Sequence, residues 1–243
     1  MNLRNNTITA ATLFILSSSV LANQPETEEI NYGDPLASFK SAGVSVSNEK
    51  SIQFNGMYGV NGHIGILDLT RTEGDKASGE GVGLGYRARY LNVDDGLGLS
   101  IDIIGNHNNL SDSTIGVVSA VYEFQVGNFM FFPMVGVGQM EIKGKKAGAD
   151  KYSTSIVQPG LHAMYAFDEG HWLYANPKIT HALKAPTGAD NSFDHNTLEL
   201  EIGGGYMLND WSSAEFKVEN SFKNSNPNSK NETTGWVKYA VYF

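Results

Sequence analysis

The chain of 243 residues contains no cysteine, so neither disulfides nor thiolate metal sites can stabilise it. It also lacks any run of 18 consecutive apolar residues, which excludes a transmembrane helix. Basic residues are scarce, because 17 Lys and Arg stand against 26 Asp and Glu, and the net charge is −9. This balance argues against a nucleic-acid partner.

The first 22 residues have the pattern of a secretory signal peptide. Arg4 is their only cation, an apolar stretch runs over 8–16, and small residues follow up to Ala22. The apolar stretch is too short to span a bilayer, so we expect cleavage after Ala22 rather than a membrane anchor. Residues 23–35 are polar and acidic with two prolines, and we expect a flexible periplasmic lead-in there.

From residue 36 to 243, segments of alternating apolar and polar residues follow one another. In the segment 82–90, Leu84 and Tyr86 lie on one side of an extended chain and Arg87 and Arg89 on the other. The alternation predicts strands over 38–47, 51–60, 63–72, 81–92, 97–106, 113–126, 129–142, 153–166, 172–184, 196–207, 211–222 and 233–243.

The connections between these segments alternate in length. Short turns fall at 93–96, 126–128, 167–171 and 208–210, and long polar loops at 72–80, 106–113, 143–151, 185–196 and 223–232. A soluble β-sandwich also alternates apolar and polar residues, but short turns at one end and long loops at the other are typical of outer-membrane barrels.

Aromatic residues gather beside the short turns, where one membrane–water boundary of a barrel would lie. They are Tyr90, Phe124, Phe129, Phe131, Tyr165, Phe167, Trp172, Tyr174, Tyr206, Trp211, Tyr242 and Phe243. The fold class predicted is therefore all-β: a transmembrane antiparallel up-and-down β-barrel over residues 36–243. Twelve strands are favoured, because the ten-strand alternative leaves 36–60 without a partner.

The last residues alternate as well, with Val237, Tyr239, Val241 and Phe243 on one face. This run resembles the C-terminal β-signal of bacterial outer-membrane proteins, a terminal Phe preceded by apolar or aromatic residues at every second position. Val241 stands where that family commonly has an aromatic residue. The resemblance implies recognition by the barrel-assembly machinery, closure of the barrel by pairing of the last strand with the first, and residence in the outer membrane of a Gram-negative cell.

Charged and polar residues of the opposite parity are predicted to face the lumen. They are Arg87, Arg89, Asp102, Glu123, His162, Lys178, Glu199, Glu201, Glu215, Lys217, Glu219 and Lys238. Acids on 196–207 and 211–222 opposite the two arginines would create a transverse field that favours small polar or charged solutes. The function predicted is a narrow pore or passive transporter for small solutes.

Two other classes stay open at this point. Paired charges can fill the lumen of a non-conducting structural barrel, because ten to twelve strands lie between filled and wide barrels. The exposed loops can instead bind partners such as lipopolysaccharide, beside the lipids that surround any outer-membrane barrel.

An enzyme such as a lipid A-modifying barrel is a weaker alternative, because it needs a nucleophile and base or a paired Asp and His at the rim. Ser192, Asp194 and His195 share one loop, but no strand carries a convincing Asp–His pair. The histidines are His63, His107, His162, His171, His181 and His195. Without a defensible catalytic pair we expect no enzyme and no cofactor, and without cysteine, a His-x-x-x-His motif or an Asp-rich calcium loop we expect no metal.

Overall fold

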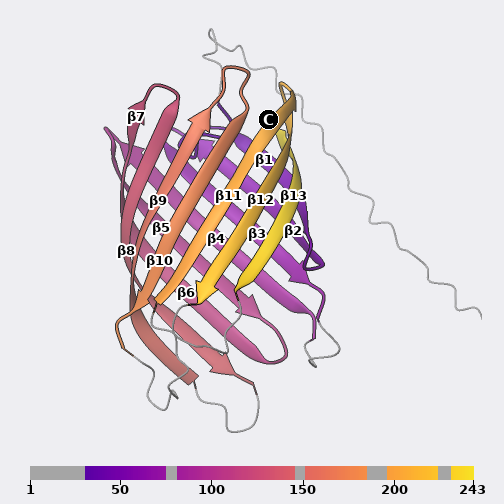
Figure 1. Ribbon diagram of the computed structural model, residues 1–243, viewed down its shortest axis with the longest axis vertical. Helices are drawn as coiled ribbons and strands as arrows, with labels where there is room; N and C mark the ends of the chain where they lie inside the picture. Colours follow the sequence, from indigo (N-terminus) through magenta and orange to yellow (C-terminus); the bar gives the residue numbers. More distant parts are fainter. Residues whose placement is uncertain (1–30, 75–80, 146–150, 185–195, 224–230) are drawn as a thin grey trace, which may run out of the picture.

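The computed structural model describes residues 31–74, 81–145, 151–184, 196–223 and 231–243 (Figure 1). The strands are β1 (Lys40–Ser47), β2 (Ser51–Val60), β3 (His63–Thr72), β4 (Gly83–Asp94), β5 (Leu97–His107), β6 (Ser111–Tyr122), β7 (Phe124–Val126), β8 (Phe129–Gly144), β9 (Lys151–Ala166), β10 (Trp172–Ala182), β11 (Asn196–Asn209), β12 (Ser212–Lys223) and β13 (Glu232–Tyr242). No helix within these ranges is long and apolar enough to cross a membrane.

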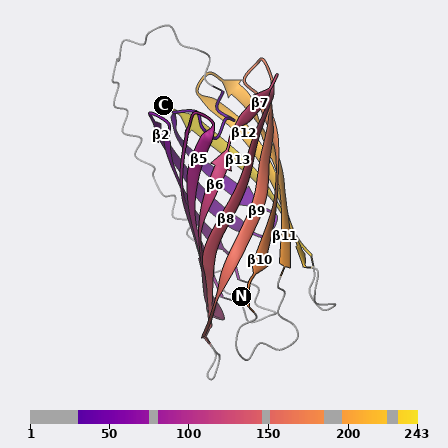
Figure 2. The same cartoon turned by 90° about the vertical axis from the view of Figure 1, so that its left-hand side faces the viewer.

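The strands close into a barrel. Consecutive strands pair antiparallel except β6 and β7, which both pair with β8, and β13 pairs with β1. Because β7 continues β6 along the same edge of β8, the wall has twelve strands. Figures 1 and 2 show the strands tilted around a single lumen. The predicted count of twelve and the predicted pairing of the last strand with the first are confirmed.

A proline accounts for the break between β6 and β7. The β6–β8 register ends where Val121 opposes Met134, and the β7–β8 register starts where Phe124 opposes Phe131. Pro133 lies in the gap, and it has no N–H to donate to the neighbouring strand. The strand predicted over 113–126 is therefore interrupted at Glu123.

The two ends of the barrel differ, as the loop lengths predicted. Asn61-Gly62 and Asp95-Gly96 form tight turns in which both residues have positive φ, the backbone that two-residue hairpin turns require. The C-terminus lies at this end, and the strand ends that flank residues 75–80, 146–150, 185–195 and 224–230 lie at the other (Figure 1). We call these the short-turn end and the long-loop end.

Apolar side chains cover the outer wall. Val44, Phe54, Leu69, Val137 and Ile202, on five different strands, are all exposed on it. A soluble protein rarely exposes a contiguous apolar surface larger than a few hundred Å². An apolar outer band around a closed barrel is instead the surface that faces lipid, so the fold is a transmembrane antiparallel β-barrel.

Inside, a cluster of apolar side chains packs in the half of the lumen next to the short-turn end. The cluster consists of Phe39, Ile64, Leu91, Val121, Met130, Phe132, Met164, Trp172, Ala240 and Tyr242. Trp172, Tyr174 and Tyr242 were predicted to lie in the boundary belt, and this is wrong, because their positions on β10 and β13 direct them inward. Tyr90, Phe124, Phe129, Tyr206 and Trp211 do lie exposed on the outer wall at that end.

Residues 31–37 run into the mouth of the barrel at the short-turn end. Tyr32, Leu36 and Ala37 pack against the apolar cluster. Gly33 is so close to Trp172 that a Cβ on it would lie 2.3 Å from the indole Cγ. Tyr32 and Gly33, which belong to the lead-in expected over 23–35, therefore have packing partners inside the barrel. The predicted signal peptide, 1–22, and residues 23–30 lie outside the described residues.

Candidate functional site

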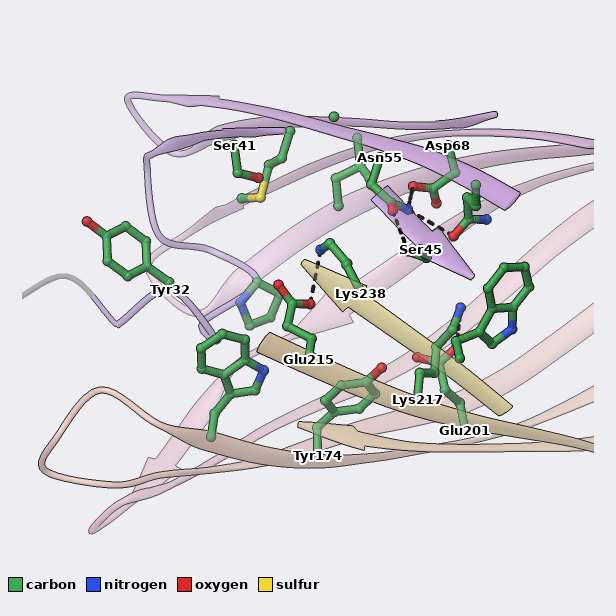
Figure 3. A pocket seen from close by; sticks show the side chains of 18 of the residues that line it. Tyr32, Ser41, Ser45, Asn55, Asp68, Tyr174, Glu201, Glu215, Lys217 and Lys238 are labelled. Carbon is green, nitrogen blue, oxygen red and sulfur yellow. Dashed lines mark hydrogen bonds and ion pairs between the residues drawn. The ribbon is translucent and has the colours of Figure 1, made fainter. Parts of the chain in front are cut away.

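The described residues line several cavities within the barrel, and three of them bear on its function. The outer cavity, of about 520 Å³, extends toward the long-loop end and is bordered by Thr72, Asn106 and Glu232. The inner cavity, of about 250 Å³, reaches Tyr32 and Tyr242 at the short-turn end (Figure 3). The side cavity, of about 90 Å³, lies against β4, β5, β6 and β8–β10.

The three cavities meet at Arg87. It is the one residue that lines all of them. The outer and inner cavities also share Gln53, Asp68, Glu201 and Lys217. A polar path therefore leads from the long-loop half of the lumen past these side chains to the segment 31–37.

On β4 and β5, two arginines share one carboxylate. Arg87 Nη2 lies 2.7 Å and Arg89 Nη2 2.8 Å from Asp102 Oδ2. Arg87 Nε also donates to Asp102 Oδ1 at 3.1 Å, so its guanidinium is held at two points. Alternation along the strands dictates this arrangement, because Arg87 and Arg89 share the inward parity of β4 and Asp102 opposes Arg89 in the register.

The opposite wall, β10–β13, carries lysines beside glutamates. Lys178 Nζ lies 2.6 Å from Glu199 Oε2, and Lys238 Nζ lies 3.0 Å from Glu215 Oε2. Lys217 Nζ lies 2.8 Å from Glu219 and 4.0 Å from Glu201. Trp236 Nε1 donates to Glu219 Oε2 at 2.8 Å, which fixes that carboxylate further.

Most of the charged side chains thus pair with neighbours on the same wall of the barrel and not with charges across the lumen. Every cation named above has a carboxylate within 3.0 Å, mostly on an adjacent strand. Arg87 is the exception that also faces the far wall, because it interacts electrostatically with Glu201 on β11 as well as with Asp68, its cross-strand neighbour on β3. The expected transverse field is therefore confined to the level of Arg87.

The structure places all but one of the predicted lumen residues on the walls of these cavities. They are Arg87, Arg89, Asp102, His162, Lys178, Glu199, Glu201, Glu215, Lys217, Glu219 and Lys238. Glu123 lines none of the three. It falls at the break between β6 and β7, close enough to Asp34 for the two carboxyl groups to interact. It therefore belongs to the mouth at the short-turn end.

A polar stripe on β1–β3 escaped the sequence prediction. Asn55 Nδ2 donates to Asp68 Oδ1 at 2.7 Å and to Gln53 Oε1 at 2.9 Å, and Ser45 Oγ donates to Asn55 Oδ1 at 2.7 Å. The sequence did hold a signal for this stripe: Asp68 has the parity opposite to that of the outward Leu67 and Leu69, so it should face the lumen. The signal was weak because Ile64 and Ile66, which share the parity of Asp68, are apolar.

The described residues offer little to hold a metal ion. These contain no group of three or more His, Cys, Asp or Glu residues that could hold a metal ion. His162 lies between the rings of Phe132 and Tyr174, with centroids 5.8 and 5.1 Å away.

The structure does contain one strand-borne Asp–His pair, which the sequence did not predict. His107 Nδ1 lies 2.5 Å from Asp112 Oδ1, and Lys145 Nζ lies 2.7 Å from the same oxygen. Lys145 also donates to the carbonyl of Asn108. The cluster therefore ties together the β5–β6 connection and the end of β8 at the long-loop rim.

No protein-family model and no curated protein sequence matches the chain. Among solved structures, it is similar to the NanC porin, with a TM-score of 0.55 and 7% identity, covering 84% of this chain and 98% of that one. The KdgM porin aligns with a TM-score of 0.49 and 8% identity, over 84% and 98% of the two chains. The β domain of the Bordetella autotransporter BrkA aligns with a TM-score of 0.42 and 13% identity, over 83% and 96%. The likeness to the NanC porin shows a shared barrel fold.

Proposed function

We propose that the protein resides in the outer membrane and forms a narrow, gated pore for small polar or charged solutes. The observation that carries this proposal is the chain of cavities that meet at Arg87. Their walls combine charged groups, amides and hydroxyls, which can replace part of the hydration shell of a passing solute. The apolar outer wall supports residence in a bilayer, and the NanC porin offers an example of this fold in a pore protein.

The segment 31–37 supplies the gate in this proposal. It borders the inner cavity at the short-turn end, where Tyr32, Asp34 and Pro35 contribute to the wall. Pro35 also borders the side cavity. A solute that passes Arg87 would meet this segment next, so transport requires its displacement.

A second candidate is a non-conducting structural barrel, and the apolar cluster favours it. Ile64, Met164 and Ala240 are completely or almost completely buried inside the barrel, as they would be in the core of a closed domain. In this alternative the segment 31–37 is a permanent plug. The exposed loops and the outer wall would then carry any function, through lipids or lipopolysaccharide.

Single-channel recording in a planar bilayer tests the pore. The refolded protein is expected to give stepwise currents with long closed intervals, because the gate is docked in the resting structure. A barrel that shows the heat-modifiable mobility of a folded outer-membrane protein, yet stays silent in the bilayer, would instead establish the structural alternative.

A further inference from the structure

The hydrogen-bond ladder between β9 and β10 is broken in the middle of the wall. Along β10, the register with β9 is lost between Ala175 and Lys178 and again between Lys178 and His181. The neighbouring β8–β9 register runs without a gap from Phe129 to Lys143. The break is thus a local property of one seam and not of the long strand β9.

Two prolines that approach each other across the seam cause the break. By the register, Pro177 on β10 stands opposite Leu161, and Pro159 on β9 stands opposite Ile179. Neither proline has an N–H, so the carbonyls of Leu161 and Ile179 each lose a ladder donor. Proline is normally confined to edges and bulges of sheets, and a closed barrel has no edge. No water replaces these bonds within a bilayer, so the seam opens at lower cost than its neighbours.

The side cavity lies directly behind this seam. Gln158 and His162 from β9 and Asn176 and Lys178 from β10 line it. Within the break, Gln158 Nε2 donates a hydrogen bond across the seam to Thr180 Oγ1 at 2.8 Å. Opening the seam would therefore connect the cavity with the lipid that surrounds the barrel.

The charge of the side cavity defines what it can hold. Arg87, Arg89 and Lys178 line it against a single carboxylate, that of Asp102. The carboxylate paired with Lys178, Glu199, borders the outer cavity instead. The excess of cations suits an anionic group, while Phe132 and Met134 add apolar surface. On the lipid side, Ile179 and Pro159 are exposed and apolar.

We propose that the β9–β10 seam is a lateral opening for an anionic single-chain amphiphile. The head group enters the side cavity, while the hydrocarbon chain remains among the lipids. Arg89 and Lys178 hold the head group, and Gln158 and Thr180 separate as it passes. This proposal needs the barrel to lie in a bilayer, but it does not depend on conduction along the barrel axis.

A disulfide across the seam tests the proposal, because the chain has no cysteine of its own. Ala163 and Ala175 oppose each other in the register beside the break, so Ala163→Cys with Ala175→Cys locks it. The matched control is Ala88→Cys with Ile103→Cys, on the complete β4–β5 ladder. The probe is dodecanoic acid carrying a photoreactive diazirine, added to the protein in lipid nanodiscs, with labelled peptides identified by mass spectrometry.

With the thiols reduced, we expect labelling of peptides that contain Phe132, Met134 or His162. Oxidation of the seam pair should lower the labelling by about tenfold, and oxidation of the control pair should leave the labelling unchanged. A dodecylamine with the same diazirine should label these peptides weakly in both states. Equal labelling in the locked and open proteins, or equal labelling by the amine, would overturn the proposal.

A second variant covers the case in which the cysteine pair does not fold. Pro159→Ala with Pro177→Ala restores both N–H donors and should protect the seam from opening, so labelling by the fatty acid falls. Pro133→Ala, at the β6–β7 break, is the matched control and should leave labelling unchanged. Undiminished labelling of the folded double variant contradicts the lateral opening. If the protein gives no channel currents but its labelling still depends on the seam, conduction along the barrel axis is refuted and the lateral opening is not.

Discussion

The ring of Tyr32 stacks on the ring of Tyr242, with centroids 4.0 Å apart and an angle of 22° between their planes. Phe39 meets both rings edge-on, at 5.1 and 5.5 Å. A residue that precedes the first strand is thereby fixed to the last strand, inside the mouth of the barrel. The segment 31–37 is held by a small number of such contacts, so single substitutions should release it.

Replacing Tyr32 with Ala should raise the open probability of the pore. Aromatic pairs contribute about 0.5–1.5 kcal/mol beyond their buried area, and this corresponds to a rise of roughly two- to tenfold. Single-channel recording measures it directly. Tyr122→Ala is the control, because Tyr122 is exposed on the outer wall near the same end. An unchanged open probability in Tyr32→Ala would show that the segment does not gate the lumen.

The pore should open more often as the pH rises, because of Asp34. Burial raises the pKa of the Asp34 carboxyl above its ordinary value of 3.8, against the opposing effect of its hydrogen bond from the Leu36 N–H. The docked segment therefore binds a proton more tightly than the released segment does. Docking is strongest below the ordinary pKa and weakens as the pH rises from there through the raised pKa.

Asp34→Asn checks this origin, since the amide oxygen can still accept from Leu36. The variant should stay mostly closed and lose the pH dependence in that range. Because the carboxyl groups of Glu123 and Asp34 interact, the variant Glu123→Gln is measured as well, to separate the effect of Glu123 from that of Asp34. The same pH profile in wild type and Asp34→Asn would refute a role for this carboxyl.

Replacing Ile202 with Arg should destabilise the barrel in a bilayer by about 2–4 kcal/mol, if its outward position lies near mid-membrane. Ile202 is exposed on the outer wall and opposes Ala175 and Val218, so the guanidinium would enter lipid. Urea unfolding in lipid vesicles measures the difference. Asn220→Arg is the control on the same wall, because Asn220 bonds to Thr233 near the long-loop rim and should cost about 1 kcal/mol or less.

Replacing Phe243 and Tyr239 with Ala should slow assembly in cells. Both side chains are exposed on the outer wall, where the proposed assembly machinery could read them, and the Phe243 N–H donates to the carbonyl of Lys40 at 3.0 Å. The fraction of heat-modifiable protein in outer-membrane preparations reports assembly. Tyr86→Ala, an outward aromatic on β4, serves as the control. Normal levels of the double variant would argue against the predicted signal.

Alternation was sufficient to predict the barrel, because a strand with one lipid face leaves a period of two in its sequence. Strands β2 and β3 match the predicted ranges, and others differ by a few residues at their ends. The interruption at Glu123 was not predicted, because its cause, Pro133, lies on the neighbouring strand β8 and leaves no mark in the alternation of 113–126.

The filling of the lumen was harder to predict than the wall. Trp172 and Tyr242 were assigned to the boundary belt because they lie beside short turns, although the parity of their strands places both side chains on the lumen side. The run 129–134 offered a signal, since it is apolar on both parities and therefore faces lipid on one side and an apolar interior on the other. The segment 31–37 has no periodicity, and only the tertiary structure places it in the mouth.

Ion selectivity at Arg87 tests the central claim most directly. Reversal potentials in a salt gradient should show that Arg87→Gln makes the pore more selective for cations and that Glu201→Gln makes it more selective for anions. Both side chains line the outer and the inner cavity, so a passing ion meets their charges. Arg71→Gln, on the outer side of β3, should leave the potential unchanged. Opposite shifts in the two lumen variants would establish conduction past Arg87 and Glu201. Identical reversal potentials in all the variants would show that any current bypasses Arg87 and would contradict the pore proposed here.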